Sequence, residues 1–400
     1  MGAIIRLNNF SYAYPESDSL VLRDISFEIR EGECLCVCGP TGSGKTTLAL
    51  ALKGLLPPGR QQGEVVTEPL SQGNGPRIGL VLQNPETQVL RSSIGAEASF
   101  GLENLCVEPH LMPGLVAEAL AVLGLEKPLN HRTDALSMGQ KYRLIMASHL
   151  VMGPHLLILD EPAGQLDPDG LRRLMGSIRR LKAEGVSFLL CENRPELVAE
   201  AVDSFLYLGK DGTLKSCGST PPVDVQSGIV PITRQAMPGT GEDIVSAQDL
   251  CLSSYTGTEI WSSVSFSLNQ GQRVLIDGMN GSGKTSLLRC LLGFIRPDSG
   301  EVRIFGSNPV PAYLQGRVGC LFQNPQRQIF ETTVFDEVAF PLRRFGHNAS
   351  SVADRVMETL TLCSIENLSA QSPHKLSYGQ KHLVALACAF AHEPELLLLD

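Results

Sequence analysis

The sequence predicts an α/β fold made of two homologous domains, each built around a parallel core sheet, and three observations support this prediction. Four short motifs recur in the same order at an offset of 239 or 240 residues, as expected for a duplicated domain. In both copies a glycine-rich loop separates a strand-like run from a helical run. The uninterrupted apolar runs 156–159 and 396–399 are typical of parallel strands covered on both faces.

Four pairs of motifs define the repeat. They are Gly39-Pro-Thr-Gly-Ser-Gly-Lys45-Thr46 with Gly278-Met-Asn-Gly-Ser-Gly-Lys284-Thr285, Gln83-Asn84-Pro85 with Gln323-Asn324-Pro325, Leu136-Ser137-Met138-Gly139-Gln140-Lys141 with Leu376-Ser377-Tyr378-Gly379-Gln380-Lys381, and Leu157-Ile158-Leu159-Asp160 with Leu397-Leu398-Leu399-Asp400. Chance does not keep four motifs in one register. We therefore expect a first domain over 1–215 and a second over 244–400, the second cut short at its acidic strand.

The strands and helices around the glycine-rich loops follow from local patterns. Residues 33–38 and 273–276 are strand-like runs that end where the loops begin. Helices are predicted over 46–53 and 285–292, because each run is amphipathic and a glycine follows it, with a proline a few residues beyond. Between the two copies, residues 216–243 are rich in Pro, Gly and Ser and lack apolar periodicity, which predicts an interdomain linker.

Composition narrows the functional classes. The 400 residues are 43% apolar and 19% charged, a globular composition that excludes wholesale disorder and collagen-like repeats. The net charge is −9 and no Lys/Arg cluster stands out, which disfavours nucleic acid as a partner. No apolar run approaches the roughly 18 residues of a membrane span.

The cysteines predict a reducing compartment rather than a disulfide framework or a metal site. There are 11 of them, an odd number, and no signal-like segment follows Met1. Cys34, Cys36 and Cys38 alternate and should share one buried face of a strand.

The glycine-rich loops predict phosphate binding. Successive backbone N–H groups can approach a phosphate closely in Gly-x-x-x-x-Gly-Lys-Thr, the lysine reaches the β- and γ-phosphates, and the threonine hydroxyl binds Mg²⁺. The structural alternative is a glycine turn without a ligand. The residues predicted to contact the nucleotide are Gly39, Pro40, Thr41, Gly42, Ser43, Gly44, Lys45, Thr46 and Thr47 in the first loop, and Gly278, Met279, Asn280, Gly281, Ser282, Gly283, Lys284, Thr285 and Ser286 in the second.

The apolar run 156–159 ends in Asp160-Glu161. Phosphoryl transfer to water uses one carboxylate to hold Mg²⁺ and a neighbour to activate the water, so we expect Asp160 on the metal and Glu161 as the base. An acidic pair that merely caps a turn before Pro162 is the alternative.

The segments Leu136–Lys141 and Leu376–Lys381 resemble the signature motif of ABC-type ATPases, Leu-Ser-Gly-Gly-Gln. The resemblance extends over essentially all 400 residues and includes the phosphate loops, the Gln-containing segments and the acidic strands. It implies two P-loop nucleotide-binding domains, each with an antiparallel β element and a helical subdomain, about 87–150 in the first domain. A serine-capped helix start is the structural reading of the signatures, and it is compatible with the functional one.

The same resemblance implies that each ATP is held between the phosphate loop of one domain and the signature of the other. Roles follow by position. The residues expected to join the nucleotide sites are Gln83 and Gln323 on Mg²⁺ and in catalysis, Asp160 and Asp400 on Mg²⁺, Ser137, Gly139, Gln140, Ser377, Gly379 and Gln380 at the γ-phosphate, and Tyr14 on the adenine. Tyr255 is the nearest counterpart of Tyr14, shifted by one position, and a core role is the alternative for Tyr14.

Two positions depart from the family pattern. Asn193 stands where the family usually has a histidine, and asparagine cannot relay a proton. The loop after Glu161 reads Gly164-Gln165-Leu166-Asp167, where the family commonly has Ser-x-Leu-Asp. These departures motivate the hypothesis that the first site binds ATP but hydrolyses it slowly.

The segments Gln83–Gln88 and Gln323–Gln328, called the Gln loops here, both read Gln-Asn-Pro-x-x-Gln and resemble those of energy-coupling-factor transporter ATPases, which serve vitamin and cobalt import. This implies a peripheral ATPase at the cytoplasmic face of the membrane, with an integral membrane scaffold and substrate-binding membrane subunits as partners. The segments 87–135 and 328–375 would receive the scaffold, although a solvated helical insert fits the residues equally well. A tandem sugar-importer ATPase and a soluble ribosome-acting ATPase remain as alternatives.

Overall fold

The computed structural model describes residues 2–15, 19–67, 77–164, 166–222, 243–253, 259–278 and 281–400, which divide into two units, Met1–Val230 and Pro231–Asp400. Unit 1 is built on a six-stranded sheet with the order β5-β6-β7-β3-β8-β9. Its strands are β3 (Cys34–Cys38), β5 (Ile78–Val81), β6 (Leu156–Asp160), β7 (Ser187–Glu192), β8 (Ser204–Leu208) and β9 (Leu214–Gly218). All neighbours are parallel except β8 and β9. This sheet is the predicted parallel core.

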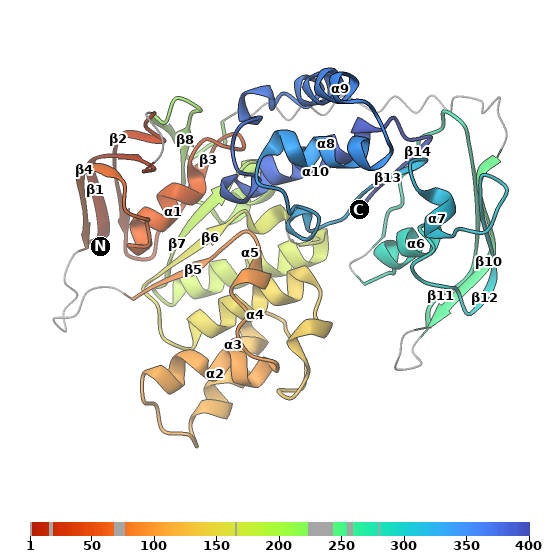
Figure 1. Ribbon diagram of the computed structural model, residues 1–400. Coiled ribbons are helices and arrows are strands. Elements are labelled where there is room, and N and C mark those ends of the chain that lie inside the picture. Colours follow the sequence, from red (N-terminus) through yellow and green to blue (C-terminus); the bar gives the residue numbers. More distant parts are fainter. Residues whose placement is uncertain are drawn as a thin grey trace. The chain divides into compact units, whose positions relative to one another are not determined.

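A second, antiparallel sheet of unit 1 has the order β2-β1-β4 and consists of β1 (Ala3–Ala13), β2 (Leu22–Arg30) and β4 (Arg60–Thr67). Figure 1 shows it beside helix α1 (Lys45–Lys53). Its buried face shares one apolar cluster with α1 and with one face of the parallel sheet, including Ile5, Leu48 and Val37. Unit 1 is therefore layered, with the parallel sheet in the middle.

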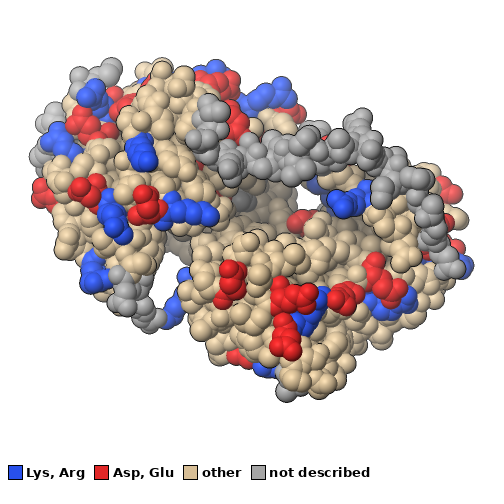
Figure 2. Space-filling view, turned by 90° about the horizontal axis from the view of Figure 1, so that it is seen from above, with Lys and Arg blue, Asp and Glu red and all other residues tan. Residues whose placement is uncertain are grey.

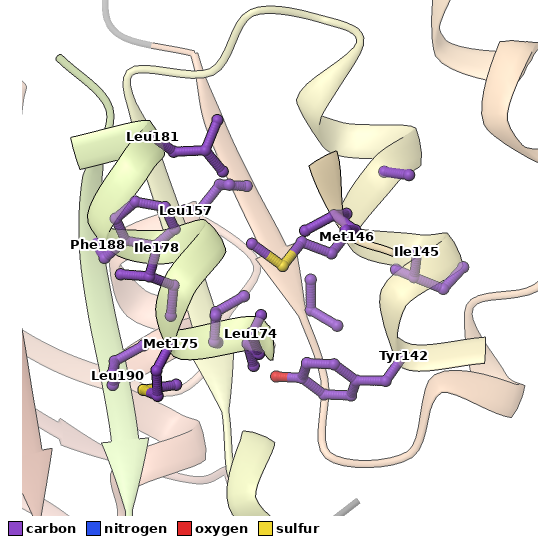
Figure 3. Packing of buried hydrophobic residues seen from close by; sticks show 14 of the residues in the cluster. Tyr142, Ile145, Met146, Leu157, Leu174, Met175, Ile178, Leu181, Phe188 and Leu190 are labelled. Carbon is purple, nitrogen blue, oxygen red and sulfur yellow. The ribbon is translucent and has the colours of Figure 1, made fainter. Parts of the chain in front are cut away.

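Helices α4 (Met138–Leu150) and α5 (Pro168–Ala183) cover the opposite face of the parallel sheet. Leu174, Ile178 and Leu181 of α5 recur at helical spacing and pack on the sheet, as Figure 3 shows. Burying each such side chain contributes about 1.5–3 kcal/mol. Asp167 caps the start of α5, since its carboxylate accepts a hydrogen bond from Gly170 N at 2.8 Å.

The helical subdomain of unit 1 consists of α2 (Ile94–Asn104), α3 (Met112–Val122) and α4, which pack together through Ala98, Leu120 and Ile145. None of the helices in the described parts of the chain is both long and apolar enough to span a bilayer.

The described residues of unit 2 repeat part of this arrangement. An antiparallel sheet with the order β11-β10-β12 is formed by β10 (Asp243–Ser253), β11 (Glu259–Asn269) and β12 (Ser299–Ile304). Strands β13 (Val318–Leu321) and β14 (Leu396–Leu399) pair in parallel with Val318 opposite Leu396, which is the β5–β6 register shifted by 240 residues. Helices α6 (Lys284–Leu291), α7 (Pro311–Leu314), α8 (Val334–Arg344), α9 (Ala349–Leu362) and α10 (Tyr378–Ala391) complete the unit.

The strand predicted over 273–276 is wrong, because these residues have an irregular conformation. The equivalent strand of unit 1, β3, is hydrogen-bonded on both sides, to β7 and β8. Among the described residues of unit 2, no strand pairs with either edge of this segment. Val274 and Leu275 are consequently 56% and 83% exposed.

The predicted linker, 216–243, overlaps regular structure at both ends. Strand β9 continues through Gly218 because its backbone pairs with Phe205 of β8, and β10 begins at Asp243. Most of the predicted linker, 223–242, lies outside the described residues.

Candidate nucleotide-binding site

The phosphate loop of unit 1 connects β3 to α1 and requires glycine for two different reasons. Gly42 and Gly44 have φ values of 82° and 101°, in the left-handed region that favours glycine. A Cβ atom on Gly39 would lie 2.2 Å from the carbonyl oxygen of Leu208. The loop therefore keeps its backbone close to β8 and turns sharply into α1, whose first N–H groups and helix dipole favour an anion.

Lys45 is buried at the base of this loop. Its Nζ donates to the carbonyl oxygens of Gly39 at 2.9 Å and Pro40 at 3.1 Å, and lies 3.7 Å from Oε1 of Glu161. The hydroxyl of Ser43 is also buried and has no hydrogen-bond partner among the described residues. A buried ammonium and an unsatisfied hydroxyl beside a glycine-rich turn fit a phosphate group.

Asp160 ends β6 next to the loop. Its Oδ2 accepts a hydrogen bond from Thr46 Oγ1 at 2.7 Å, whereas its buried Oδ1 has no partner in the described part of the chain. The pKa of this carboxyl is raised to about 7, chiefly by burial; the charge of Glu161 also raises it, whereas the Thr46 hydrogen bond and the charge of Lys45 lower it. A buried carboxylate with an open oxygen beside a threonine hydroxyl fits Mg²⁺, which prefers oxygen ligands.

Glu161 is held in the left-handed conformation, with φ at 47°. Its own N–H donates to Cys191 O at 2.8 Å. Pro162 has no N–H, and the next one, on Ala163, donates to Oε1 of Glu192 at 2.7 Å. Two consecutive residues of β7 thus hold the backbone on both sides of Glu161, while its side chain accepts from Gln83 Nε2 at 2.6 Å.

Glu192 is the residue at this site that sequence reasoning missed. It is fully buried at the end of β7, and its carbonyl oxygen accepts from Gly39 N at 3.2 Å. Burial raises the pKa of its carboxyl to about 7, helped by the charge of Glu161, and its Oε2 has no partner among the described residues. The signal was present in the sequence, because an acidic residue ends the otherwise apolar run 188–191.

Tyr14 follows β1 and lies beside the phosphate loop. Its hydroxyl is 3.0 Å from Thr47 Oγ1, and its ring meets that of Tyr12 edge-on at 5.1 Å. The structure thus places a half-buried aromatic ring next to the loop. Tyr255 lies outside the described residues.

The structure of the Gln loops explains the residues of the Gln-Asn-Pro-x-x-Gln motif. Asn84 Oδ1 accepts from Glu86 N at 3.0 Å and caps a single helical turn that begins at Pro85. Gln88 closes the loop, since its amide accepts from Leu82 N at 2.7 Å and donates to Leu80 O at 2.8 Å. Gln328 makes the same two bonds in unit 2, to Phe322 and Cys320. The second glutamine of the motif therefore fixes the loop to the strand that precedes it.

Both signature segments start a helix with a capping box. Ser137 Oγ accepts from Gln140 N at 3.3 Å and Gln140 Oε1 accepts from Ser137 N at 3.1 Å, and the Ser377–Gln380 pair repeats this arrangement at 3.3 and 3.0 Å. Gly139 and Gly379 lie in the first turn of α4 and α10. Each serine hydroxyl accepts within the box, which leaves its hydrogen able to donate elsewhere.

The signature helices also contact the Gln loops of their own units. Lys141 of α4 forms a salt bridge of 2.7 Å with Glu86. In unit 2 the hydroxyl of Tyr378 donates to the carbonyl oxygen of Gln323 at 3.0 Å. Each signature is thereby connected to its Gln loop, by different chemistry in the two units.

Unit 2 brings its own predicted residues together in part. Thr285 Oγ1 donates to Asp400 Oδ1 at 2.9 Å, which repeats the Thr46–Asp160 contact, and Lys284 Nζ donates to Gly278 O at 2.6 Å. Gly281 and Gly283 have φ values of 87° and 89°. Ser282 precedes α6 and Ser286 lies in it, whereas Met279 and Asn280 are outside the described residues.

The pairing of each phosphate loop with the other unit's signature stays a prediction. It would join the first loop to Ser377, Gly379 and Gln380, and the second to Ser137, Gly139 and Gln140.

Known proteins resemble this chain along its whole length. The ABC transporter family model matches residues 22–164 and 261–400. A protein of Methanosarcina mazei, provisionally named an ABC transporter ATP-binding protein, is 30% identical over 467 residues, covering 100% of this chain and 79% of the relative. A Bacillus subtilis protein, provisionally named an HMP/thiamine import ATP-binding protein, is 30% identical, covering 99% of this chain and 81% of the relative.

Solved structures match about half of the chain. The protein CbiO1 of Clostridium perfringens, part of the ABC transporter complex CbiONQ, is 28% identical with a TM-score of 0.48, covering 54% of this chain and 88% of that one. The family model matches twice, once in each unit, and the curated relatives align over nearly the full length. The chain therefore belongs to the ABC transporter family, as an ATP-binding protein with two ABC ATPase domains in tandem.

Proposed function

We propose that this protein is the ATP-hydrolysing subunit of an importer, which converts ATP and water to ADP and phosphate and drives a separate membrane scaffold. The observation that carries the proposal is the threonine–aspartate contact beside a phosphate loop, present in both units. Hydrolysis and phosphate release would separate two domains that ATP had brought together, and that cycle would move the scaffold.

In unit 1 the residues present suit this chemistry. Thr46, Asp160 and Gln83 would hold Mg²⁺, which neutralises phosphate charge when bound. Lys45 would bind the β- and γ-phosphates. Glu161 would accept the proton of the attacking water, because its carboxylate is oriented by Gln83 and its backbone is fixed by β7.

Contacts within each unit suit a partner that acts through the Gln loop. Leu90, just after the first Gln loop, is 68% exposed, and Phe330, at the equivalent position of unit 2, is 57% exposed. A partner resting on these residues would move the Gln loop, which contacts Glu161 in unit 1 and the signature helix in both units. This supports the helical segments as the place where the scaffold docks.

The cargo we propose is a vitamin or a metal ion, and the protein would lie peripherally at the cytoplasmic face of the membrane. The sequence of the Gln loops resembles that of energy-coupling-factor transporter ATPases. The Bacillus subtilis relative, whose name assigns it to HMP/thiamine import, adds a second argument for a small nutrient. Cargo recognition would belong to a membrane subunit.

We further propose that the first site, which contains Lys45 and Asp160, binds ATP but hydrolyses it slowly. Asn193 follows Glu192 where the family usually has a histidine, and its amide cannot change charge as the transition state forms.

Affinity purification of the full-length protein from gently solubilised cells tests the importer proposal. Mass spectrometry should recover integral membrane proteins, and Lys45→Ala/Lys284→Ala should serve as a nucleotide-binding-deficient control. Recovery of ribosomal proteins without membrane proteins would instead support the ribosome-acting alternative. Recovery of sugar-transporting membrane proteins would instead support the sugar-importer alternative.

A further inference from the structure

Each unit presents an exposed apolar residue on a similar scaffold directly after its Gln loop. In unit 1, Oε2 of Glu97 accepts backbone hydrogen bonds from Leu90 N and Arg91 N, at 2.8 and 2.7 Å. In unit 2, Oε2 of Glu337 accepts from Phe330 N and Glu331 N, at 2.9 and 2.7 Å.

Both glutamates are only 3% exposed, so each unit places a buried carboxylate where it holds an exposed apolar residue. Burying a carboxylate is costly unless it is hydrogen-bonded, and here it fixes the surface backbone. A fixed, exposed apolar side chain is typical of a protein contact.

Several apolar side chains differ between the two units. Leucine in unit 1 is replaced by phenylalanine in unit 2 at three equivalent positions, which are Leu55 and Phe294, Leu82 and Phe322, and Leu90 and Phe330. In unit 2 two aromatic pairs form, Phe294 with Phe322 at 6.3 Å and Phe330 with Phe340 at 4.7 Å. The exposed residue after the Gln loop is therefore aliphatic in unit 1 and aromatic in unit 2, whereas Phe100 and Phe340 supply an aromatic ring in both units.

The charges beside them are reversed. Arg91 covers the ring of Phe100 at 4.8 Å and pairs with Glu103 at 3.3 Å. The equivalents of Arg91 and Glu103 are Glu331 and Arg343. Arg343 pairs with Asp336 at 3.0 Å, and Glu331 has no salt bridge within the described parts of unit 2.

On the face that Figure 2 shows, acidic and basic side chains are interspersed. The residues beside Leu90 and Phe330 are therefore distinguished by a local reversal of charge, not by a broad surface of one sign.

We propose that the two surfaces bind different segments of the membrane partner, one of them acidic and one basic. The inference rests on the proposed importer function. Surface 1 (Leu90, Arg91, Phe100) takes a segment that places an acidic side chain beside Arg91. Surface 2 (Phe330, Glu331, Phe340) takes a segment with a basic side chain and a flat apolar contact. Reversed charges disfavour the exchanged arrangement, so the ATPase binds the partner in one orientation.

Photocrosslinking tests this inference directly. Full-length protein carrying p-benzoylphenylalanine at position 90 or 330 would be bound to membranes of the source cells and irradiated, and the crosslinked peptides identified by mass spectrometry. We expect two different stretches of membrane protein, with Asp or Glu in the stretch crosslinked from position 90 and Lys or Arg in the one crosslinked from position 330.

Charge exchange within one unit supplies the matched control. The pair Arg91→Glu/Glu103→Arg keeps the local salt bridge but reverses the charge beside Leu90. It should lower crosslinking from position 90 about tenfold and leave position 330 unchanged. Glu331→Arg, which keeps the Arg343–Asp336 pair, should do the converse. Thermal melting of each variant checks that it remains folded.

The possible results separate this inference from the proposal on which it rests. The same stretch crosslinked from both positions, or yields that ignore charge exchange, would overturn the inference and leave the importer function standing. Crosslinks to proteins that are not membrane-embedded, or no crosslinks from either position, would overturn both.

Discussion

The buried carboxyl of Glu192 makes a quantitative prediction about stability. Its pKa is raised from 4.5 to about 7, chiefly by burial. Between these two values the folded state holds a proton that the unfolded state has lost, so the free energy of unfolding falls as pH rises. The stabilising contribution is fully present below the unfolded pKa and is lost as pH rises through the folded pKa.

The size of this effect follows from the shift. Each pKa unit corresponds to about 1.4 kcal/mol, so the site should cost the native state about 2–3 kcal/mol between roughly pH 5 and pH 8. Glu192→Gln keeps an oxygen that can accept from Ala163 N but does not titrate. The variant should therefore lack this part of the pH dependence, while the contribution of Asp160 and other groups is common to both proteins.

Hydrogen exchange of peptides that cover β7 is a suitable assay, because it reports opening of unit 1 within the full-length protein. We expect the stability difference between Glu192→Gln and wild type to shift in favour of the variant by about 2–3 kcal/mol on going from about pH 5 to pH 8. Equal pH dependence in the two proteins would refute the reasoning. Glu192→Ala, which also does not titrate but lacks the acceptor for Ala163 N, should be about 1–3 kcal/mol less stable than Glu192→Gln at either pH.

Three further predictions concern the site itself. Glu161→Gln should leave total ATPase within about twofold of wild type if unit 2 carries most turnover, and loss of most activity would contradict slow hydrolysis in unit 1. Because the pKa of Asp160 is raised to about 7, protons should compete with Mg²⁺ at lower pH, so Mg²⁺ affinity in the presence of ATP should fall by up to about tenfold per pH unit below that value. Asp160→Asn should abolish this pH dependence of Mg²⁺ affinity. The same pH profile in the variant and in wild type would argue against Asp160 as a Mg²⁺ ligand. Gln88→Leu removes two hydrogen bonds from the Gln88 side chain to the backbone, so it should lower the opening free energy measured by hydrogen exchange around Leu82 by about 1–2 kcal/mol. Protection equal to wild type would show that the loop closes without the Gln88 amide.

Much of the fold could be predicted from the sequence, because its signals are local or repeated. The glycines of the phosphate loop, the apolar run of β6 and the serine caps of α4 and α10 each depend on residues close together in sequence. The duplication then assigned the same elements to unit 2, and the register of β13 with β14 repeats that of β5 with β6.

The strand predicted over 273–276 failed for the complementary reason. Its apolar run has the right local composition, but a central strand exists only when neighbours bond to both of its edges. In unit 1 those neighbours are β7 and β8, which follow β3 in the sequence by more than a hundred residues. No local pattern carries that information.

Tertiary contacts also explain which site residues were missed. The role of Glu192 depends on Ala163 N and Gly39 N, which reach it only after β3, β6 and β7 have come together. Gln88 and Gln328 belong to the Gln-Asn-Pro-x-x-Gln motif in the sequence. Their function in closing the loop is visible only in the two hydrogen bonds that each side chain makes.

The central claim is that each unit binds one Mg·ATP through its own phosphate loop, and binding stoichiometry tests it most directly. Calorimetric titration of the full-length protein with a non-hydrolysable ATP analogue and Mg²⁺ should give two sites per chain. Lys45→Ala and Lys284→Ala should each remove one site, and the double variant should bind none. Undiminished binding by the double variant, or a single site in the wild-type chain, would contradict the account.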